Sequence, residues 1–303
     1  MSSKSKYLIC IVGPTAIGKT ALSIKLAQHF NTEIISADSR QFYKEMCIGT
    51  AVPSQDELNA AKHHFIQHIS ITDEYNVGRF EQDAIAKITS IFKEKSMVIA
   101  VGGSGLYMDS IVNGLDNFPK IDSSIRQKLN SHLDNKGLHH LQEQLKKLDL
   151  ESYNGITLDN PKRVIRALEI CIGTGKPYSS FLNKNDTNRN FKTIYIGLKA
   201  ERDILYHRIN KRVDIMMKTG LIDEVKSLQH YQELNALNTV GYKELFKYLN
   251  GDWDLNFAIS EIKKNTRRFA KRQLTWYRKN ESIIWFNYLT DANTIIKRIN
   301  EII

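Results

Sequence analysis

The segment from Tyr7 to Thr20, YLICIVGPTAIGKT, constrains the fold more than any other part of the sequence. Its apolar first half, residues 7–12, predicts a buried strand, and helix-forming sequence follows the segment. Between the two, the residues fit the pattern G-x-x-x-x-G-K-[ST] in the strand, loop and helix order that this motif requires. Backbone N–H groups and the start of the helix surround phosphate oxygens in such a loop. We therefore predict a phosphate-binding loop, with a ligand-free glycine turn as the alternative. The loop consists of Gly13, Pro14, Thr15, Ala16, Ile17, Gly18, Lys19 and Thr20.

Length and composition place the chain among ordinary globular proteins. Its 303 residues are enough for an α/β core with one smaller domain, and 42% of them are apolar against 25% charged. Lys and Arg outnumber Asp and Glu by 43 to 33, which suggests a polyanionic partner, although many basic enzymes bind none. The cysteines Cys10, Cys47 and Cys171 form no C-x-x-C pair, which favours a reducing compartment over a zinc site or a disulfide framework. Because no stretch approaches the roughly 18 apolar residues of a membrane span, we expect a cytoplasmic protein without a membrane partner.

Strands and helices alternate along most of the chain. Buried strands are predicted at residues 33–37, 97–101 and 193–198, and amphipathic helices at residues 80–93 and 201–218. This alternation predicts an α/β fold of the phosphate-loop NTPase type, with a parallel sheet and flanking helices. Ligands bind beyond the carboxyl ends of such strands, which puts Asp38 beside the phosphate loop. Asp38 is there either a general base or the cap of a turn or helix.

The strand at residues 97–101 ends in Gly102-Gly103-Ser104-Gly105. An ordinary phosphate-loop NTPase has an Asp after this strand that helps to hold magnesium. Its absence argues against nucleotide hydrolysis. The glycines suggest a backbone that comes close to a ligand, with the Ser104 hydroxyl hydrogen-bonded to that ligand.

Three histidines, His63, His64 and His68, follow one another closely. The spacing of His64 and His68 would put two imidazoles on one helical face, but no Glu stands between them as in the zinc motif H-E-x-x-H. We therefore favour structural or surface histidines over a metal site.

Polar helical sequence replaces the α/β pattern after residue 115. We expect the core in residues 1–115, an inserted helical domain carrying Arg126 in residues 116–158, and the rest of the core with a helical basic end in residues 159–303. A helix begins at Pro161 and is expected to end at Gly173. Its cationic side chains, which form either a solvated face or a phosphate contact, are Lys162, Arg163 and Arg166.

Two further helices carry arginines or lysines beside apolar residues. Arg208 and Arg212 follow the edge of the apolar stripe at residues 201–218, so each points either into the site or into a surface ion pair. The segment at residues 261–279 has eight Lys or Arg and one acid. The aromatics interleaved with these charges are Phe269, Trp276 and Tyr277. Positive charge beside aromatic rings suits a single-stranded RNA loop, with a solvated basic helix as the alternative.

These motifs occur in the order of a known family and extend over nearly the whole chain. The chain resembles the tRNA dimethylallyltransferases, also called isopentenylpyrophosphate tRNA transferases, of the bacterial type. The segments that carry the resemblance are GPTAIGKT, SADSRQFYKEMCIGTA, VGGSGLY, NPKRVIRALEI, MMKTGLIDEV, TVGYKEL and TRRFAKRQLTWYR.

The resemblance implies a phosphate-loop fold without nucleotide chemistry. Residues 13–20 would hold the diphosphate of dimethylallyl diphosphate, and the five-carbon group would pass to the N6 amine of adenosine 37 in tRNAs reading codons that begin with U. Asp38 would be the general base. Ser104 and Arg212 would bind the leaving diphosphate, together with Lys19, Thr20 and a magnesium ion held by Thr20. The target base would leave its stack to reach the site.

The resemblance also implies how the anticodon stem-loop is bound, by a chain that we expect to be monomeric. The implied tRNA contacts are Asp38, Ser39, Arg40, Gln41, Ser104, Arg126, Lys162, Arg163, Val164, Ile165, Arg166, Arg268 and Arg272. Some positions depart from the family pattern: Ser104 stands where threonine is commoner, and Val52, Lys62 and Gln67 alter the region of donor entry. No cysteine follows Cys171, so the zinc finger of eukaryotic relatives is absent.

Three other functions fit part of the pattern. A small-molecule or nucleotide kinase also places an Asp after its second strand, but it would turn over ATP, and the VGGSGLY segment argues against it. An enzyme that prenylates free adenine nucleotide would share the donor site without needing the basic helix. A non-catalytic RNA-binding protein with a vestigial phosphate loop would not depend on Asp38.

Overall fold

The computed structural model describes residues 5–182 and 189–303. The chain divides into two compact units. The core unit comprises Met1–Asn113 and Arg189–Ile303, and the inserted unit is Gly114–Asn188. None of the helices in the described residues combines the length and apolar character needed to cross a membrane.

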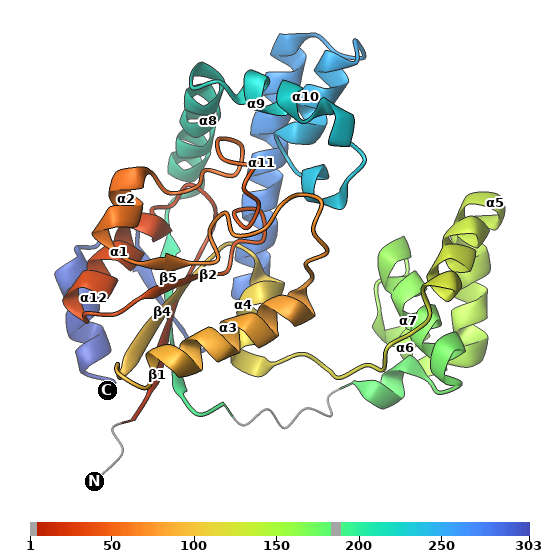
Figure 1. Cartoon of the computed structure of the whole chain (residues 1–303), viewed down its shortest axis with the longest axis horizontal. Coiled ribbons are helices and arrows are strands. Elements are labelled where there is room, and N and C mark those ends of the chain that lie inside the picture. Colours follow the sequence, from red (N-terminus) through yellow and green to blue (C-terminus); the bar gives the residue numbers. More distant parts are fainter. Residues whose placement is uncertain (1–4, 183–188) are drawn as a thin grey trace. The chain divides into compact units, whose positions relative to one another are not determined.

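A parallel sheet lies at the centre of the core unit (Figure 1). The described residues give it six strands in the order β3-β2-β4-β1-β5-β6, and every neighbouring pair is parallel. The strands are β1 (Tyr7–Val12), β2 (Ile34–Ser36), β3 (His63–His64), β4 (Met97–Val101), β5 (Lys192–Lys199) and β6 (Ile283–Asn287). The predicted parallel α/β fold is therefore confirmed, whereas β3 and β6 were not predicted.

Both faces of the sheet are covered by helices. Side chains alternate between the two faces of a strand, and in β1 the odd-numbered residues join one apolar cluster while the even-numbered residues join the other. Helices α1 (Lys19–His29) and α12 (Ala292–Asn300) pack in the first cluster, and α3 (Val77–Ile91) and α4 (Gly105–Asn113) in the second. Parallel strands buried on both faces become continuous apolar runs, which is why most of them were visible in the sequence.

A third apolar cluster joins the helices that follow β5 to the loop after β2. Tyr43 and Met46 of that loop pack with side chains of the helices. The long helix α11 begins after Asp254, whose carboxylate accepts a hydrogen bond from the Phe257 N–H at 3.0 Å. The elements of this region are α2 (Gln55–Ala60), α8 (Arg202–Lys218), α9 (Leu221–Ser227), η2 (Gln229–Tyr231), η3 (Asn235–Leu237), α10 (Tyr242–Leu249) and α11 (Leu255–Tyr277).

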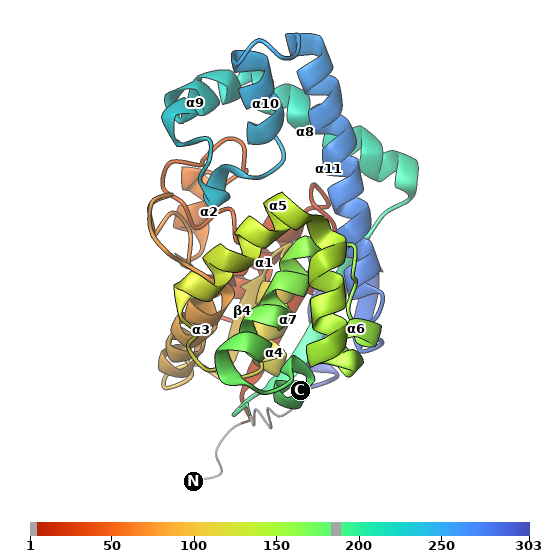
Figure 2. The same ribbon diagram turned by 90° about the vertical axis from the view of Figure 1, so that its right-hand side faces the viewer.

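The inserted unit is helical (Figure 2). It consists of α5 (Ser123–Leu148), interrupted at Gly137, then α6 (Leu150–Gly155), α7 (Pro161–Thr174) and η1 (Tyr178–Phe181). The expected insertion ended at residue 158, but α7 packs its apolar stripe against α5 in one cluster and so belongs to this unit. Helix α7 also continues past Gly173, where it was expected to end. It stops at Gly175, which adopts the left-handed conformation at φ 67°.

Candidate active site

The phosphate loop follows β1 at the carboxyl edge of the sheet. Gly13 has φ 139° and Gly18 has φ 108°, values that a residue with a side chain rarely adopts. At Gly13 a Cβ atom would also lie 2.7 Å from the Leu198 carbonyl oxygen. Helix α1 begins at Lys19, directly after Gly18, so its unpaired N–H groups point into the loop. This backbone has the geometry expected of an anion-binding loop.

The Lys19 ammonium lies inside this loop. Its Nζ donates to the carbonyl oxygens of Gly13 at 3.0 Å and Pro14 at 2.8 Å. Burial lowers the pKa of Lys19 to about 8, with Asp38 opposing the change and Arg212 adding to it. A bound anion would raise this pKa again, because negative charge nearby favours the protonated form.

Two cavities meet at the loop. The first, of about 560 Å³, is lined by the phosphate loop and by the start of α1. The second, of about 430 Å³, is lined by side chains of α8 and α11 and by the loops after β2 and β4. The residues that line both are Thr15, Asp38, Thr50 and Arg212. Asp38 therefore reaches ligands in either cavity.

Arg212, rather than Arg208, belongs to both cavities. Burial lowers the pKa of the Arg212 guanidinium, an effect that the nearby Asp38 opposes. Arg208 lines the first cavity only, donates from Nε to the Ala16 carbonyl at 2.8 Å and stacks on the Tyr288 ring, so it supports the phosphate loop. The surface ion pair considered for these arginines is not seen, since neither forms a salt bridge within the described residues.

Ser104 connects the loop after β4 with the loop after β2. Its Oγ accepts a hydrogen bond from the Ser39 N–H at 3.2 Å and lies 3.2 Å from the Ser39 Oγ. Ser104 also lines the second cavity. Its hydroxyl therefore contacts the residue that follows Asp38 and also lies at the second cavity.

The glycines on either side of Ser104 allow close contacts within the protein. A Cβ atom at Gly102 would lie 2.3 Å from the Ala37 carbonyl oxygen, and one at Gly103 would lie 2.3 Å from Nε2 of Gln273. At Gly105 it would lie 2.5 Å from the Trp276 ring. The close approach that requires glycine is therefore to the protein itself. Gly102 also lines the first cavity, so a backbone held close to a ligand stays a prediction.

Two of the expected RNA contacts bind the protein backbone. Arg40 donates from Nη1 to the carbonyl oxygens of Asn235 at 3.0 Å and Ala236 at 2.8 Å. Gln41 donates from Nε2 to the carbonyl oxygens of Thr50 at 3.2 Å and Ala51 at 2.9 Å. Both side chains therefore hold loops that border the cavities, and Arg40 also lines the second cavity.

The basic and aromatic side chains of helix α11 lie in different surroundings. Phe269 and Arg272 are exposed and line the second cavity. Arg268 is also exposed, but it lies on another side of the helix, in a basic groove with Lys271 and Arg202. Of the three interleaved aromatics, Phe269 is thus the candidate stacking surface at the second cavity.

The other two aromatics do not line the second cavity, and Trp276 is exposed whereas Tyr277 is buried. Trp276 donates from Nε1 to the Asp109 carboxylate at 2.9 Å, and Tyr277 is only 2% exposed. The prediction that Tyr277 stacks on RNA was wrong, because the same apolar face that made the helix amphipathic buries it. Burial also raises the pKa of Asp109, which the Trp276 hydrogen bond partly offsets.

Sequence reasoning missed Gln273, which touches both ligand loops. Its Oε1 accepts from the Thr15 N–H at 2.8 Å, and its Nε2 donates to the Gly103 carbonyl at 2.9 Å. The signal available was a glutamine on the buried face of a basic helix. Glu224 was missed in the same way: its carboxylate accepts from the N–H groups of Cys47, Ile48 and Gly49.

The inserted unit orders its basic residues around one acid. The Glu169 carboxylate accepts from Arg126 at 2.7 Å and from Arg166 at 2.9 Å, and these bonds outweigh its burial and hold its pKa below the usual value. Lys162 and Arg163 are exposed. Val164 and Ile165 are buried in the core of this unit at 0% and 6% exposure. Their side chains therefore cannot contact RNA, since they form the apolar stripe of α7.

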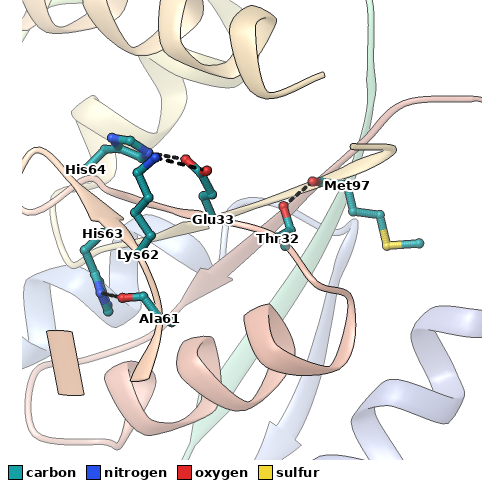
Figure 3. A network of polar contacts seen from close by, with 7 residues as sticks. All are labelled: Thr32, Glu33, Ala61, Lys62, His63, His64 and Met97. Carbon is teal, nitrogen blue, oxygen red and sulfur yellow. Dashed lines mark hydrogen bonds and ion pairs between the residues drawn. The ribbon is translucent and has the colours of Figure 1, made fainter. Parts of the chain in front are cut away.

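The clustered histidines are structural (Figure 3). His63 and His64 form strand β3, so they are not on a helical face. His64 Nε2 lies 2.5 Å from the Glu33 carboxylate, to which Lys62 also donates at 3.2 Å. Burial lowers the pKa of His64, and Glu33 only partly offsets this. No group of three or more His, Cys, Asp or Glu within residues 5–182 and 189–303 is arranged to hold a metal ion.

The chain is similar to known proteins of one family. Residues 41–280 match the family described as IPP transferase. Similar proteins include the tRNA dimethylallyltransferase of Flavobacterium johnsoniae, 60% identical over 98% of both chains, and that of Christiangramia forsetii, 61% identical over 97% of this chain and 98% of the relative.

Solved structures show the same fold. A tRNA isopentenylpyrophosphate transferase from Bacillus halodurans is 37% identical, with a TM-score of 0.72 over 98% of this chain and 95% of the other. A eukaryotic dimethylallyltransferase acting on tRNA is 29% identical, with a TM-score of 0.79 over 98% of this chain and 77% of the other. The family match spans most of the chain and the relatives align over nearly all of it, so the chain belongs to the IPP transferase family.

Proposed function

We propose that the protein transfers the dimethylallyl group of dimethylallyl diphosphate to the N6 amine of adenosine 37 in tRNAs reading codons that begin with U, and releases diphosphate. The observation that carries this proposal is the position of Asp38 and Arg212, which line both cavities. A group transfer between two bound substrates needs a base and a cation at the point where the substrates meet. The names of the relatives, which are tRNA dimethylallyltransferases, support the same assignment.

The first cavity suits the donor. Backbone N–H groups of residues 13–20, the Lys19 ammonium and the Arg212 guanidinium bind the diphosphate and stabilise the charge that develops on it as it leaves. Thr20 lines this cavity beside Lys19, so its hydroxyl would hold a magnesium ion there. When bound, this ion supplies further positive charge on the leaving group.

The second cavity suits the acceptor base. Phe269 offers a ring for stacking, and Arg272, whose guanidinium lies 5.7 Å from that ring centre, offers a cation for phosphate. Adenosine 37 leaves its stack to enter this cavity. Arg268 of α11 and Arg126, Lys162, Arg163 and Arg166 of the inserted unit contact the RNA backbone.

The reaction then follows from these positions. The N6 nitrogen forms a bond to C1 of the dimethylallyl group while the bond from C1 to the diphosphate oxygen breaks. The Asp38 carboxylate takes the proton that N6 loses. Ser104 hydrogen-bonds to Ser39, which keeps the Asp38 loop in place, and its hydroxyl also faces the ligand. We expect a monomer that acts in the cytoplasm.

One assay separates this function from its rivals. The protein is incubated with radiolabelled dimethylallyl diphosphate and magnesium, together with unmodified tRNA, AMP or no acceptor. We expect label in tRNA alone, at a single adenosine found by nuclease digestion. Label in AMP would instead indicate an adenylate prenyltransferase. No transfer, combined with ATP turnover in a parallel incubation with ATP, would indicate a kinase, and tRNA binding without either would indicate an RNA-binding protein.

A further inference from the structure

Gln273 is the point at which the basic helix α11 meets both loops of the donor site. Its side chain accepts from the Thr15 N–H at 2.8 Å in the phosphate loop and donates to the Gly103 carbonyl at 2.9 Å in the loop that precedes Ser104. The residue is 5% exposed, so these two bonds form away from solvent. Removing either bond would leave a buried backbone group without its partner.

The chemistry of the two partners requires a carboxamide. A backbone N–H can only donate and a carbonyl can only accept, so the bridging group needs one acceptor and one donor at its tip. An ionised glutamate supplies the acceptor but no donor. Asparagine is shorter by one methylene. The glycine at residue 103 leaves room for the carboxamide, because a Cβ atom there would lie 2.3 Å from the Gln273 Nε2.

Gln273 also belongs to the helix that lines the acceptor cavity. Phe269 is four residues away on α11, about one turn, and Arg272 is its neighbour in sequence. Both line the second cavity, whereas Gln273 points toward the loops. We call the two hydrogen bonds of Gln273 the bridge. A ligand that orders this part of α11 therefore also orders the bridge, and the bridge holds Thr15 and Gly103 in place.

From this arrangement we infer that Gln273 is a positioning residue that couples the two substrate sites, so that RNA bound at α11 tightens the binding of diphosphate at the phosphate loop. The coupling is positive because the first ligand holds the bridge in place, and less ordering then remains for the second ligand. By linkage, diphosphate tightens RNA binding by the same factor. This inference rests on the proposed function for the identity of the two ligands.

Inorganic pyrophosphate and an unmodified anticodon stem-loop RNA test the coupling without any reaction, because no dimethylallyl group is present. Calorimetry gives the Kd of pyrophosphate with magnesium, alone and with saturating RNA. For the wild-type protein we expect RNA to lower this Kd at least about fivefold, the lower end of typical coupling between sites.

Two variants break the bridge from opposite sides. Gln273→Glu keeps the acceptor and removes the donor, and Gly103→Ala displaces the carboxamide without altering α11 or adding charge. In both we expect RNA to change the pyrophosphate Kd by less than about twofold, well under typical coupling. The added charge of glutamate weakens pyrophosphate with or without RNA, so the ratio of the two Kd values is the informative quantity.

A matched control is Gln28→Glu on α1. Gln28 also donates to a backbone carbonyl, that of Ala60 at 3.1 Å, but lies at the end of α1 far from the loop. This variant should keep the wild-type ratio, and thermal unfolding should show that all variants are folded. Wild-type coupling retained in both bridge variants, or absent from a wild-type protein that transfers label normally, would overturn the inference alone. A wild-type protein that transfers no label to tRNA would overturn the proposed function and the inference with it.

Discussion

The hydroxyl oxygens of Ser39 and Ser104 lie 3.2 Å apart, and Ser104 also accepts from the Ser39 N–H. This contact joins the loops that follow β2 and β4, two neighbouring strands. Asp38 directly precedes Ser39 and lines both cavities. The position of the proposed base therefore depends on the serine that stands in the glycine loop, and a hydroxyl at residue 104 is needed for more than ligand binding.

Salt dependence tests whether α11 binds the RNA backbone. Arg268 and Arg272 are exposed, and a variant that no longer neutralises one phosphate should show a slope of log K against log salt that is shallower by roughly 0.7 for a single strand. We expect Arg268→Gln and Arg272→Gln to have this effect on tRNA binding in filter-binding titrations over a range of salt.

The control for that experiment removes charge elsewhere. Arg298→Gln affects a residue paired with Glu301, and Lys93→Gln an exposed lysine, and neither position lines the two cavities. Both should keep the wild-type slope. An unchanged slope after neutralising Arg268 and Arg272 would show that this helix is not at the RNA interface.

The pH dependence of diphosphate binding should depend on Lys19. In the free protein its pKa is lowered to about 8, so the ammonium loses its proton as the pH rises through that value. The affinity for pyrophosphate should then fall by up to about tenfold per pH unit above 8. Lys19→Arg remains charged and provides the reference, which removes the effect of the ligand's own titration. Parallel curves for the two proteins between pH 7 and 9.5 would contradict this account.

Glu224 should contribute to the stability of the loop that carries Thr50. Its carboxylate accepts from the N–H groups of Cys47 at 2.9 Å, Ile48 at 2.6 Å and Gly49 at 2.9 Å. Glu224→Gln turns one acceptor into a donor facing these groups, so we expect unfolding to become easier by about 1–3 kcal/mol in urea titrations. Glu301→Gln at an exposed ion pair should cost no more than about 1 kcal/mol. Equal losses of stability in both variants would argue against a structural role for Glu224.

Protonation of His68 should make the fold less stable in mild acid. Its ring packs edge-on against Phe42 and Tyr75, and neither nitrogen has a partner among the described residues. Burial lowers the pKa of His68, with Asp83 opposing and Lys44 adding to the effect. The folded state thus binds fewer protons than the unfolded state, and stability is lost as the pH falls below the unfolded value of about 6.5.

Replacement of His68 checks this sign. The apolar variant His68→Leu should show a smaller fall in unfolding temperature between pH 7.5 and pH 5.5 than the wild-type protein. His230→Leu removes an exposed imidazole outside this ring cluster and should leave the curve as it is. A wild-type unfolding temperature that rises on acidification would contradict the direction of the shift.

The sequence predicted those parts of the fold that depend on local patterns. The strands β1, β2, β4 and β5 are buried apolar runs, and the phosphate loop has a fixed spacing of glycines, so both were visible without a structure. Strand β3 has two residues, both histidine, and β6 is a short run whose pairing with β5 depends on contacts far apart in sequence. The pairing leaves no local pattern, but the apolar residues of β6 do, and that signal was overlooked.

The candidate site was predictable to a similar extent. Motif spacing identified the loop and Asp38, because strand ends of a parallel sheet meet at one edge. It could not show that Arg40 and Gln41 bind backbone carbonyls, that Tyr277 is buried, or that Gln273 bridges two loops. Those outcomes depend on which side chains from distant segments meet, and the composition of α11 alone does not determine them.

The measurement that tests the central claim most directly is transfer by Asp38→Asn. The amide keeps the size of the carboxylate but cannot take the proton from N6. In single-turnover assays with labelled donor and saturating tRNA, we expect the rate to fall by about two to four orders of magnitude, the usual effect of a positioned base. The affinities for tRNA and for pyrophosphate should stay close to those of the wild-type protein. Transfer at the wild-type rate in this variant would remove Asp38 from the mechanism and contradict the account.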